Sequence, residues 1–237
     1  ADFINTIDVL GDDAVVDSII QRTITEFNDN VLTLVGENAF NRCAALKSVN
    51  MPNVKSILAN AFCGCTMLES VYFPELTLAD HQKTAANGAF DGCTVLKTVE
   101  MPKLMYIKNG MFKNCKALVS VDFPNAVLGT EANPGMSAFQ GCTSLTSVNI
   151  PNLTVIPSYF FYDTALESSE FPLVTKVDNY GFARTKAEKY SFSSLAEIKG
   201  DNTFSECYNL TALVIRNTES VATLGNAVCF NGKGNTA

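Results

Sequence analysis

The chain has 237 residues, of which 47% are hydrophobic, and a formal net charge of −7. This apolar content is sufficient for a large core. Its 17 lysines and arginines against 24 aspartates and glutamates argue against nucleic acid as a partner, because phosphate binding requires a basic surface. The sequence contains no run of about 18 apolar residues, so it predicts no insertion into a membrane.

The first predicted element is an amphipathic helix near the start of the chain. Apolar residues recur at helical spacing between Val15 and Phe27. The polar side of this helix carries Asp17 and Glu26 against a single cation, Arg22, which favours a protein cap over a helix lying on a membrane. We therefore expect residues 1–30 to form an N-terminal cap.

From residue 31 onward, one unit of sequence is repeated about eight times. Clear copies are NAFCGCTMLESVYFP at 60–74, GAFDGCTVLKTVEMP at 88–102 and SAFQGCTSLTSVNIP at 137–151. The phenylalanine near the start of each copy recurs every 21 to 28 residues, at Phe40, Phe62, Phe90, Phe112, Phe139, Phe161, Phe182 and Phe204. Such a period is typical of a solenoid, whose units bury their apolar faces only against their neighbours.

Each unit predicts two short extended stretches and one compact turn around the phenylalanine. An apolar pair such as Leu96 and Val99 precedes a proline, which ends a strand because it cannot donate to a strand ladder. A second apolar pair, such as Leu104 and Ile107, follows the turn. We expect both pairs to lie in the core of every coil.

The pattern AF-x-x-C-x-x-L-x-S-V-x-[FIM]-P, complete at 61–74 and 138–151, resembles the BspA-like, or Treponema-type, leucine-rich repeats. The resemblance covers about residues 31–228. It implies an α/β repeat solenoid, a right-handed leucine-rich-repeat-like coil with a parallel β-sheet face, to which we add the N-terminal capping helix. Residues 31–237 would then form the solenoid, with a truncated last unit.

Members of this family are mostly extracellular or surface proteins of bacteria and protists that serve adhesion and host interaction. The resemblance therefore implies a secreted or cell-surface module that binds a protein or glycan on a host or neighbouring cell. The segment 19–26 also resembles leaders that precede such repeats in phage-tail and prophage-associated proteins. An attachment or structural protein of a virion is therefore the alternative.

Six of the eight cysteines stand three residues after the repeated phenylalanine: Cys43, Cys65, Cys93, Cys115, Cys142 and Cys207. Stacked at about 5 Å with parallel Cβ vectors, they do not suit the dihedral angle of a disulfide, so we expect buried thiols. Thr164 and Thr185 take this position in two units that are one residue shorter, where we expect looser packing. Cys63 and Cys65 lack the second pair of ligands that a zinc site needs, so we expect no metal site.

The sequence offers little for catalysis. His81 is the only histidine, and a lone histidine in a polar insertion is most often a solvated loop residue. The glycine-rich stretch at 232–234 has no flanking strand and helix that would make a phosphate-binding loop. We therefore expect a protein that is not an enzyme and holds no cofactor.

Two columns of side chains are predicted on the outer face of the sheet, because alternate residues of a strand point outward. One column is Ser48, Ser70, Thr98, Ser120, Ser147 and Ser168. The other is Asn50, Tyr72, Glu100, Asp122, Asn149 and Glu170. We predict that Tyr72, Glu100 and Asp122 contact the ligand, although ordinary exposed strand residues would give the same pattern.

Two connections are longer than the others. The distance from proline to the next phenylalanine is usually 10 residues, but it is 16 from Pro74 and 15 from Pro124. One regular coil separates these insertions, so they would emerge about 10 Å apart on one side of the solenoid. Such insertions often carry binding residues, and neutral insertion is the alternative. The predicted contacts are Asp80, His81, Gln82, Lys83, Glu131 and Asn133.

Shortening both insertions to the regular ten-residue connection should preserve folding, because no core position is removed. Ligand binding should weaken at least tenfold, or about 1.4 kcal/mol. Circular dichroism and titration of the trimmed protein would measure the two effects. Unchanged affinity would remove the insertions from the binding site.

Overall fold

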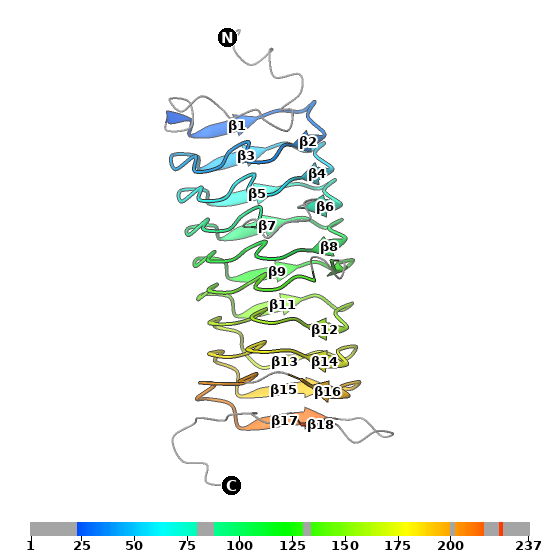
Figure 1. Cartoon of the computed structure of the whole chain (residues 1–237). Coiled ribbons are helices and arrows are strands. Elements are labelled where there is room, and N and C mark those ends of the chain that lie inside the picture. Colours follow the sequence, from blue (N-terminus) through cyan, green and yellow to red (C-terminus); the bar gives the residue numbers. More distant parts are fainter. Residues whose placement is uncertain (1–22, 80–87, 130–133, 200–201, 216–222, 225–237) are drawn as a thin grey trace.

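The computed structural model describes residues 23–79, 88–129, 134–199, 202–215 and 223–224. The chain winds through a stack of about eight coils, and successive coils lie directly one above another along a nearly straight axis (Figure 1). Strands pair in parallel wherever they are hydrogen-bonded, and the partner is always the equivalent strand of a neighbouring coil. The pairing is interrupted between β7 and β9, β11 and β13, β6 and β8, and β10 and β12. The predicted parallel solenoid is therefore confirmed.

The odd-numbered strands build one side of the stack, which we call the sheet face. They are β1 (Glu26–Asn28), β3 (Ser48–Asn50), β5 (Ser70–Tyr72), β7 (Thr98–Glu100), β9 (Ser120–Asp122), β11 (Ser147–Asn149), β13 (Ser169–Glu170), β15 (Lys189–Phe192) and β17 (Ala212–Ile215). Equivalent residues stand opposite one another, as in the row Val49, Val71 and Val99. The valines point inward and are buried, whereas both neighbours in β5 and β7 are exposed.

The even-numbered strands build a second side, after the proline turn. They are β2 (Leu34–Val35), β4 (Ser56–Ile57), β6 (Leu78–Ala79), β8 (Tyr106–Ile107), β10 (Val127–Leu128), β12 (Val155–Ile156), β14 (Lys176–Val177), β16 (Glu197–Ile198) and β18 (Thr223–Leu224). Side-chain amides secure the turns between the two sides. Asn125 donates to the carbonyl of Pro102 at 3.1 Å, and Asn152 donates to that of Pro124 at 2.9 Å.

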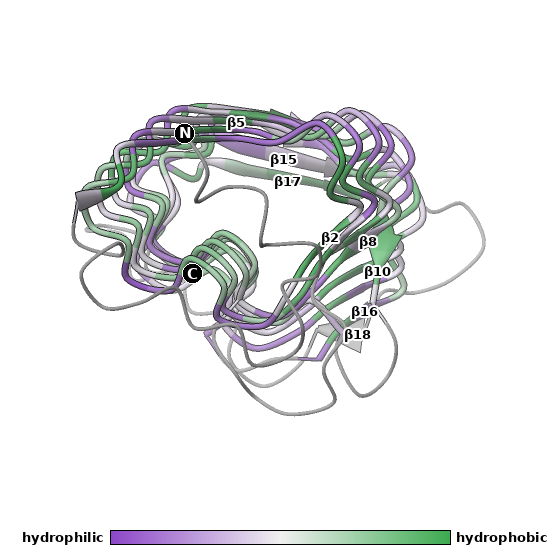
Figure 2. Ribbon diagram, turned by 90° about the horizontal axis from the view of Figure 1, so that it is seen from above, coloured by the Kyte–Doolittle hydropathy of each residue, from purple (hydrophilic) through white to green (hydrophobic). Residues whose placement is uncertain are grey.

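The third side, which we call the turn side, carries the segment around each repeated phenylalanine (Figure 2). It too forms a ladder: the N–H of Phe62 donates to the carbonyl of Ala89 at 2.8 Å, and that of Phe112 donates to Ala138 at 2.8 Å. Residues two places before or after the phenylalanine have positive φ, as at Asn60 (56°) and Gly64 (73°), with the exception of Gly88. These left-handed residues turn the chain twice, which keeps the phenylalanine side chain pointing inward.

The interior is a set of continuous columns. The eight repeated phenylalanines stack ring on ring, with centroids 5.1 Å apart between Phe40 and Phe62 and 5.5 Å apart between Phe182 and Phe204. Both predicted apolar pairs are buried, as shown by Leu96 with Val99 and by Leu104 with Ile107. Each coil thus covers the apolar surface of the next, as repeat proteins require.

In the second of the two shorter units, a larger side chain fills the place where looser packing was expected, whereas in the first the smaller Ser169 stands at the valine position and is partly buried. In the second unit, the small Ala187 stands at a position that is leucine elsewhere, but Tyr190 replaces the valine and is fully buried. The Tyr190 ring lies 4.4 Å from Phe182, and its hydroxyl donates to Thr185 Oγ1 at 2.8 Å. The larger ring therefore fills the volume that the smaller alanine leaves.

The predicted α/β class and the N-terminal capping helix are not supported. From residue 24 onward the described chain is built from strands and turns, and β1 already occupies residues that the helix was predicted to include. Phe27 pairs with Val49 across the ladder, and its ring packs edge-on against Phe40 at 4.9 Å. The solenoid therefore begins before the predicted boundary at residue 31, while residues 1–22 and the predicted truncated unit after residue 224 lie outside the described residues.

Truncating one ring of the central stack should destabilise the whole array. Phe90 is fully buried between Phe62 and Phe112, so Phe90→Ala should lower the free energy of unfolding by about 3 to 5 kcal/mol. Val119, which is 50% exposed, provides the control Val119→Ala, with an expected change below about 0.5 kcal/mol. Urea titration followed by circular dichroism measures both, and equal effects would contradict the stacked core.

Candidate functional site

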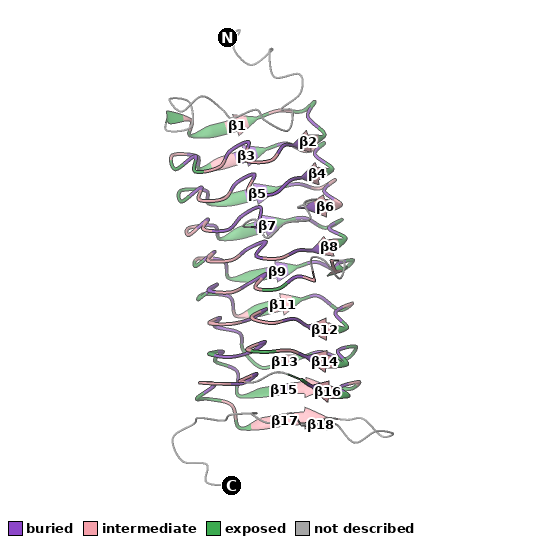
Figure 3. Ribbon diagram, in the orientation of Figure 1, coloured by how far each residue is buried: buried purple, intermediate pink, exposed green. Residues whose placement is uncertain are grey.

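The sheet face presents the two predicted polar columns to solvent (Figure 3). Every member of the column Asn50, Tyr72, Glu100, Asp122, Asn149 and Glu170 is exposed. The hydroxyl column is also exposed, except that Ser48 is partly buried. The exposure expected from strand alternation is thus confirmed, whereas a ligand contact stays a prediction.

Tyr72, Glu100 and Asp122 lie on adjacent strands β5, β7 and β9. Tyr72 stands opposite Glu100 in the ladder and is 46% exposed. Asp122 accepts a hydrogen bond of 2.7 Å from the side-chain amide of Asn149 on β11. Strand pairing places Tyr72 beside Glu100, and Asp122 follows on the neighbouring strand β9, which is not hydrogen-bonded to β7 but pairs with β11. An aromatic ring and two carboxylates, distant in sequence, therefore lie on three successive coils of one face.

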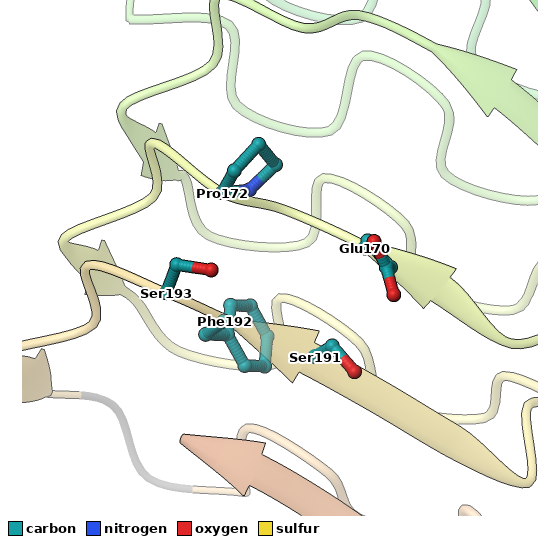
Figure 4. Close-up of a pocket in the computed structure, with 5 residues that line it drawn as sticks. All are labelled: Glu170, Pro172, Ser191, Phe192 and Ser193. Carbon is teal, nitrogen blue, oxygen red and sulfur yellow. The ribbon is translucent and has the colours of Figure 1, made fainter. Parts of the chain in front are cut away.

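A small depression continues this row at its C-terminal end (Figure 4). It lies between β13 and β15 and is lined by Glu170, Pro172, Ser191, Phe192 and Ser193. Glu170 and Ser191 stand opposite each other in the ladder. Glu170, Pro172 and Ser193 are exposed here, whereas Phe192 is buried beneath them, so the polar groups and the Pro172 ring are what this end of the face offers to a ligand.

The two sequence insertions leave the solenoid from equivalent places. One follows β6 and the other follows β10, and β8 lies between these strands: Met105 donates its N–H to the carbonyl of Thr77, and Val127 donates to that of Met105. The predicted order of an insertion, a regular coil and a second insertion is confirmed. Their predicted contact residues, Asp80, His81, Gln82, Lys83, Glu131 and Asn133, lie outside the described residues.

The cysteine column is the main polar feature of the interior, and its six thiols are free and buried. Each thiol after the first donates to the backbone carbonyl of the repeated phenylalanine one coil earlier. Cys65 reaches Phe40 at 3.0 Å, and Cys115 reaches Phe90 at 3.2 Å. The same bond is made by Cys93 to Phe62, Cys142 to Phe112 and Cys207 to Phe182. The thiols therefore fasten one coil to the next.

Sequence reasoning missed this hydrogen-bonding role of the thiols. The signal was present, because the two units without cysteine have threonine, another small donor, and not alanine. Thr164 Oγ1 bonds the carbonyl of Phe161 in its own unit at 3.0 Å, and Thr185 Oγ1 contacts Cys207 Sγ at 3.4 Å. A column occupied by either Cys or Thr indicates a position that requires a hydrogen-bond donor as well as a small side chain.

Burial determines the chemistry of these thiols. It raises the pKa of Cys43 to about 11, and it raises the pKa values of Cys65, Cys93, Cys115 and Cys142 further. A thiol that stays protonated is neither a nucleophile nor a metal ligand. Among the described residues, no three His, Cys, Asp or Glu side chains converge as metal ligands do. The interior column is therefore structural.

A tyrosine cluster on the turn side also escaped the sequence reasoning. The rings of Tyr159, Tyr162 and Tyr180 touch one another across two coils. The sequence signal for Tyr159 and Tyr180 was a bulky residue two places before the phenylalanine, where other units have asparagine, glycine or serine. This surface lies apart from the strands of the sheet face.

Comparison with known proteins agrees with this geometry. A family model described as "BspA type Leucine rich repeat region" matches residues 18–134, 74–173 and 132–235, in 6 copies. The chain belongs to this family. The BspA-type repeat thus accounts for the Phe, Cys and Leu columns together, and the predicted resemblance is confirmed. No functionally curated protein matches the chain.

Solved structures show the same fold. One is a leucine rich cell surface protein from Faecalibacterium prausnitzii, with a TM-score of 0.50 and 21% identity over 82% of this chain and 48% of that one. A leucine-rich repeat protein from Bacteroides ovatus gives 0.55 and 16%, over 80% and 63%. The T. pallidum leucine rich repeat protein gives 0.52 and 26%, over 76% and 72%. This BspA-type chain spans about half the length of the first relative and under two thirds of the second.

In the described part of the chain, no helix has the length and apolar character needed to cross a membrane. The BspA-type family generally provides a binding scaffold without catalytic activity. The exposed sheet face is therefore the first candidate for the functional surface.

The buried thiols should make stability fall at alkaline pH. Between their ordinary pKa of 9.0 and their raised folded-state pKa, about 11 for Cys43, the unfolded chain loses protons that the folded chain keeps. The free energy of unfolding should therefore decrease above pH about 9, by about 1.4 kcal/mol per pH unit for each such thiol. Urea titrations at several pH values measure this slope.

Cys115→Thr is the matched variant, since Thr occupies the same column elsewhere and does not ionise. Above pH about 9, the free energy of unfolding of this variant should decrease less steeply with pH than that of the wild type, by the contribution of one thiol. Identical slopes would show that Cys115 is not protected from ionisation in the folded state.

Proposed function

We propose that this BspA-type protein is a non-catalytic binding module that recognises a protein or glycan ligand through its sheet face. The observation that supports the proposal most directly is the row of Tyr72, Glu100 and Asp122, exposed on the three successive strands β5, β7 and β9 of the sheet face. Neighbouring coils fix the backbone beneath this row, so a ligand would order few protein groups on binding. Tyrosine also contributes large contact area at low entropic cost.

A position at the bacterial surface, facing a host or neighbouring cell, follows as part of the proposal. It is supported by the family and by the similar fold of a protein described as a cell surface protein. The attachment role in a phage tail, predicted as the alternative, would use the same scaffold. Genes for tail proteins beside this gene would favour that alternative, whereas a secretion signal with a wall anchor would favour adhesion.

The charge of the surface suggests how the ligand is selected. In the described part of the chain, neither Glu100 nor Asp122 of this row forms an ion pair. Lys97 and Lys103 pair instead with Glu69 and Glu75. A ligand that presents cationic or hydroxyl groups would complement this row. Exposed ion pairs at the rim add little affinity, so the row itself should dominate.

The combined variant Tyr72→Ala, Glu100→Gln and Asp122→Asn tests the proposal. Screening the wild-type protein against printed glycans and extracellular matrix proteins supplies a ligand, and titration then gives its dissociation constant. The variant should bind at least tenfold more weakly, or by about 1.4 kcal/mol, and should fold normally because all three side chains are exposed.

Val31→Ser with Met105→Ser is the control, since both side chains are exposed and lie outside the strands of the sheet face. It should bind as the wild type does. Equal affinity of the three-residue variant and the control would refute a role for the sheet face.

A further inference from the structure

Four tyrosines gather on the turn side of the last three coils, and we call Tyr159, Tyr162, Tyr180 and Tyr208 the tyrosine cluster. The rings of Tyr159 and Tyr180 are stacked with centroids 4.8 Å apart. Tyr162 stands edge-on to both, at 5.5 Å and 6.2 Å. Tyr208, in the following coil, is 64% exposed and joins the group through Glu206, to whose Oε2 its hydroxyl donates at 3.5 Å.

Polar groups hold these rings in place. The guanidinium of Arg184 lies 5.6 Å from the Tyr162 ring centroid, and its Nε and Nη2 each donate to Glu206 Oε2 at 3.1 Å. Asn202 donates to the Tyr180 hydroxyl at 3.0 Å. The cluster is therefore rigid before any ligand arrives, which lowers the entropic cost of binding.

Two hydroxyl groups of the cluster remain available. Those of Tyr159 and Tyr162 have no hydrogen-bond partner among the described residues, and neither is a buried unsatisfied group. Tyr180 accepts from Asn202, and its own proton is still free to donate. The cluster thus combines apolar ring surface with hydroxyl groups that face water.

The fold does not require tyrosine at these positions. Tyr159 and Tyr180 adopt φ values of 60° and 56°, a left-handed conformation that is unfavourable for bulky side chains. The equivalent residues of the other coils are Asn38, Asn60, Gly88, Gly110, Ser137 and Asn202. Two strained tyrosines side by side, where the other units have small or polar residues, indicate a functional constraint.

The size and charge of the surface restrict what binds there. Three of the four tyrosines are partly buried, so the cluster exposes less than the roughly 800 Å² that each partner buries in a standard protein interface. The ion pair beside its rings, Arg184 with Glu206, carries no net charge. A small uncharged ligand with apolar faces and many hydroxyl groups fits this combination.

We propose that the tyrosine cluster is a binding site for a neutral saccharide. The apolar C–H faces of a sugar ring pack on tyrosine rings, and its hydroxyl groups bond the tyrosine hydroxyls and the Arg184–Glu206 pair. The inference rests on the proposed binding role but assigns it a second surface, on the turn side. The two surfaces are tested separately below.

The test uses Tyr159→Asn with Tyr180→Asn, which installs the residue that other coils carry at the same left-handed position. A printed array of neutral and acidic oligosaccharides is probed with wild type, and the strongest neutral binder is titrated by calorimetry. The variant should bind it at least tenfold more weakly. Its melting temperature should stay within about 3 °C, because relieved backbone strain offsets the lost ring contact.

Tyr208→Ser provides a second variant at an exposed position and should also weaken binding. Tyr106→Asn, on β8 away from the cluster, should leave it unchanged. The inference is overturned by an array without neutral binders, by equal affinity of wild type and the double variant, or by light scattering that shows the tyrosines joining two copies of the chain. Loss only in the sheet-face variant would overturn it too, while leaving the proposed function standing.

Discussion

The parallel hydrogen-bond ladder between successive coils is the constraint on which the rest of this structure depends. It runs in stretches along both strand sides, and along the turn side the N–H of every repeated phenylalanine from Phe40 to Phe182 reaches the next coil. Because the ladder spacing is close to the separation of stacked rings, identical side chains fall into contact at every step. Phe62 and Phe90, 28 residues apart in sequence, stack at 5.3 Å for this reason.

The same ladder explains why the interior is unreactive and why the outward-facing side chains are the candidates for ligand binding. A thiol in the column donates to a carbonyl of the preceding coil and remains protonated because it is buried. Outward positions are under no such constraint, since neither strand register nor core volume depends on them. The row at Tyr72 and the strained tyrosines at 159 and 180 are both departures from the repeat that the scaffold tolerates.

Most of the fold could be predicted because each unit repeats the same inward positions. Leu96, Val99 and Ile107 are buried as strand alternation and the proline turn indicate. The N-terminal helix was predicted wrongly where the chain forms β1: the spacing of Ile24 and Phe27 suits a helix locally, but pairing with β3 and packing on Phe40 favour a strand. Packing around Ala187 was also predicted wrongly. Alanine in place of leucine indicates a loss of volume at that position, but it does not show that the larger Tyr190 fills the space.

The sequence by itself determined the period, the two strands and turn of each coil, the buried columns and the exposed row, because all of these follow from short-range patterns repeated many times. Only the tertiary structure decided which outward residues of different coils meet. Tyr162, Arg184 and Glu206 are brought together by the turn-side ladder and by left-handed backbone at Tyr180 and Arg184. The short-range sequence pattern specifies neither the register between coils nor the sign of φ. The tyrosine cluster can therefore be recognised only in the folded structure.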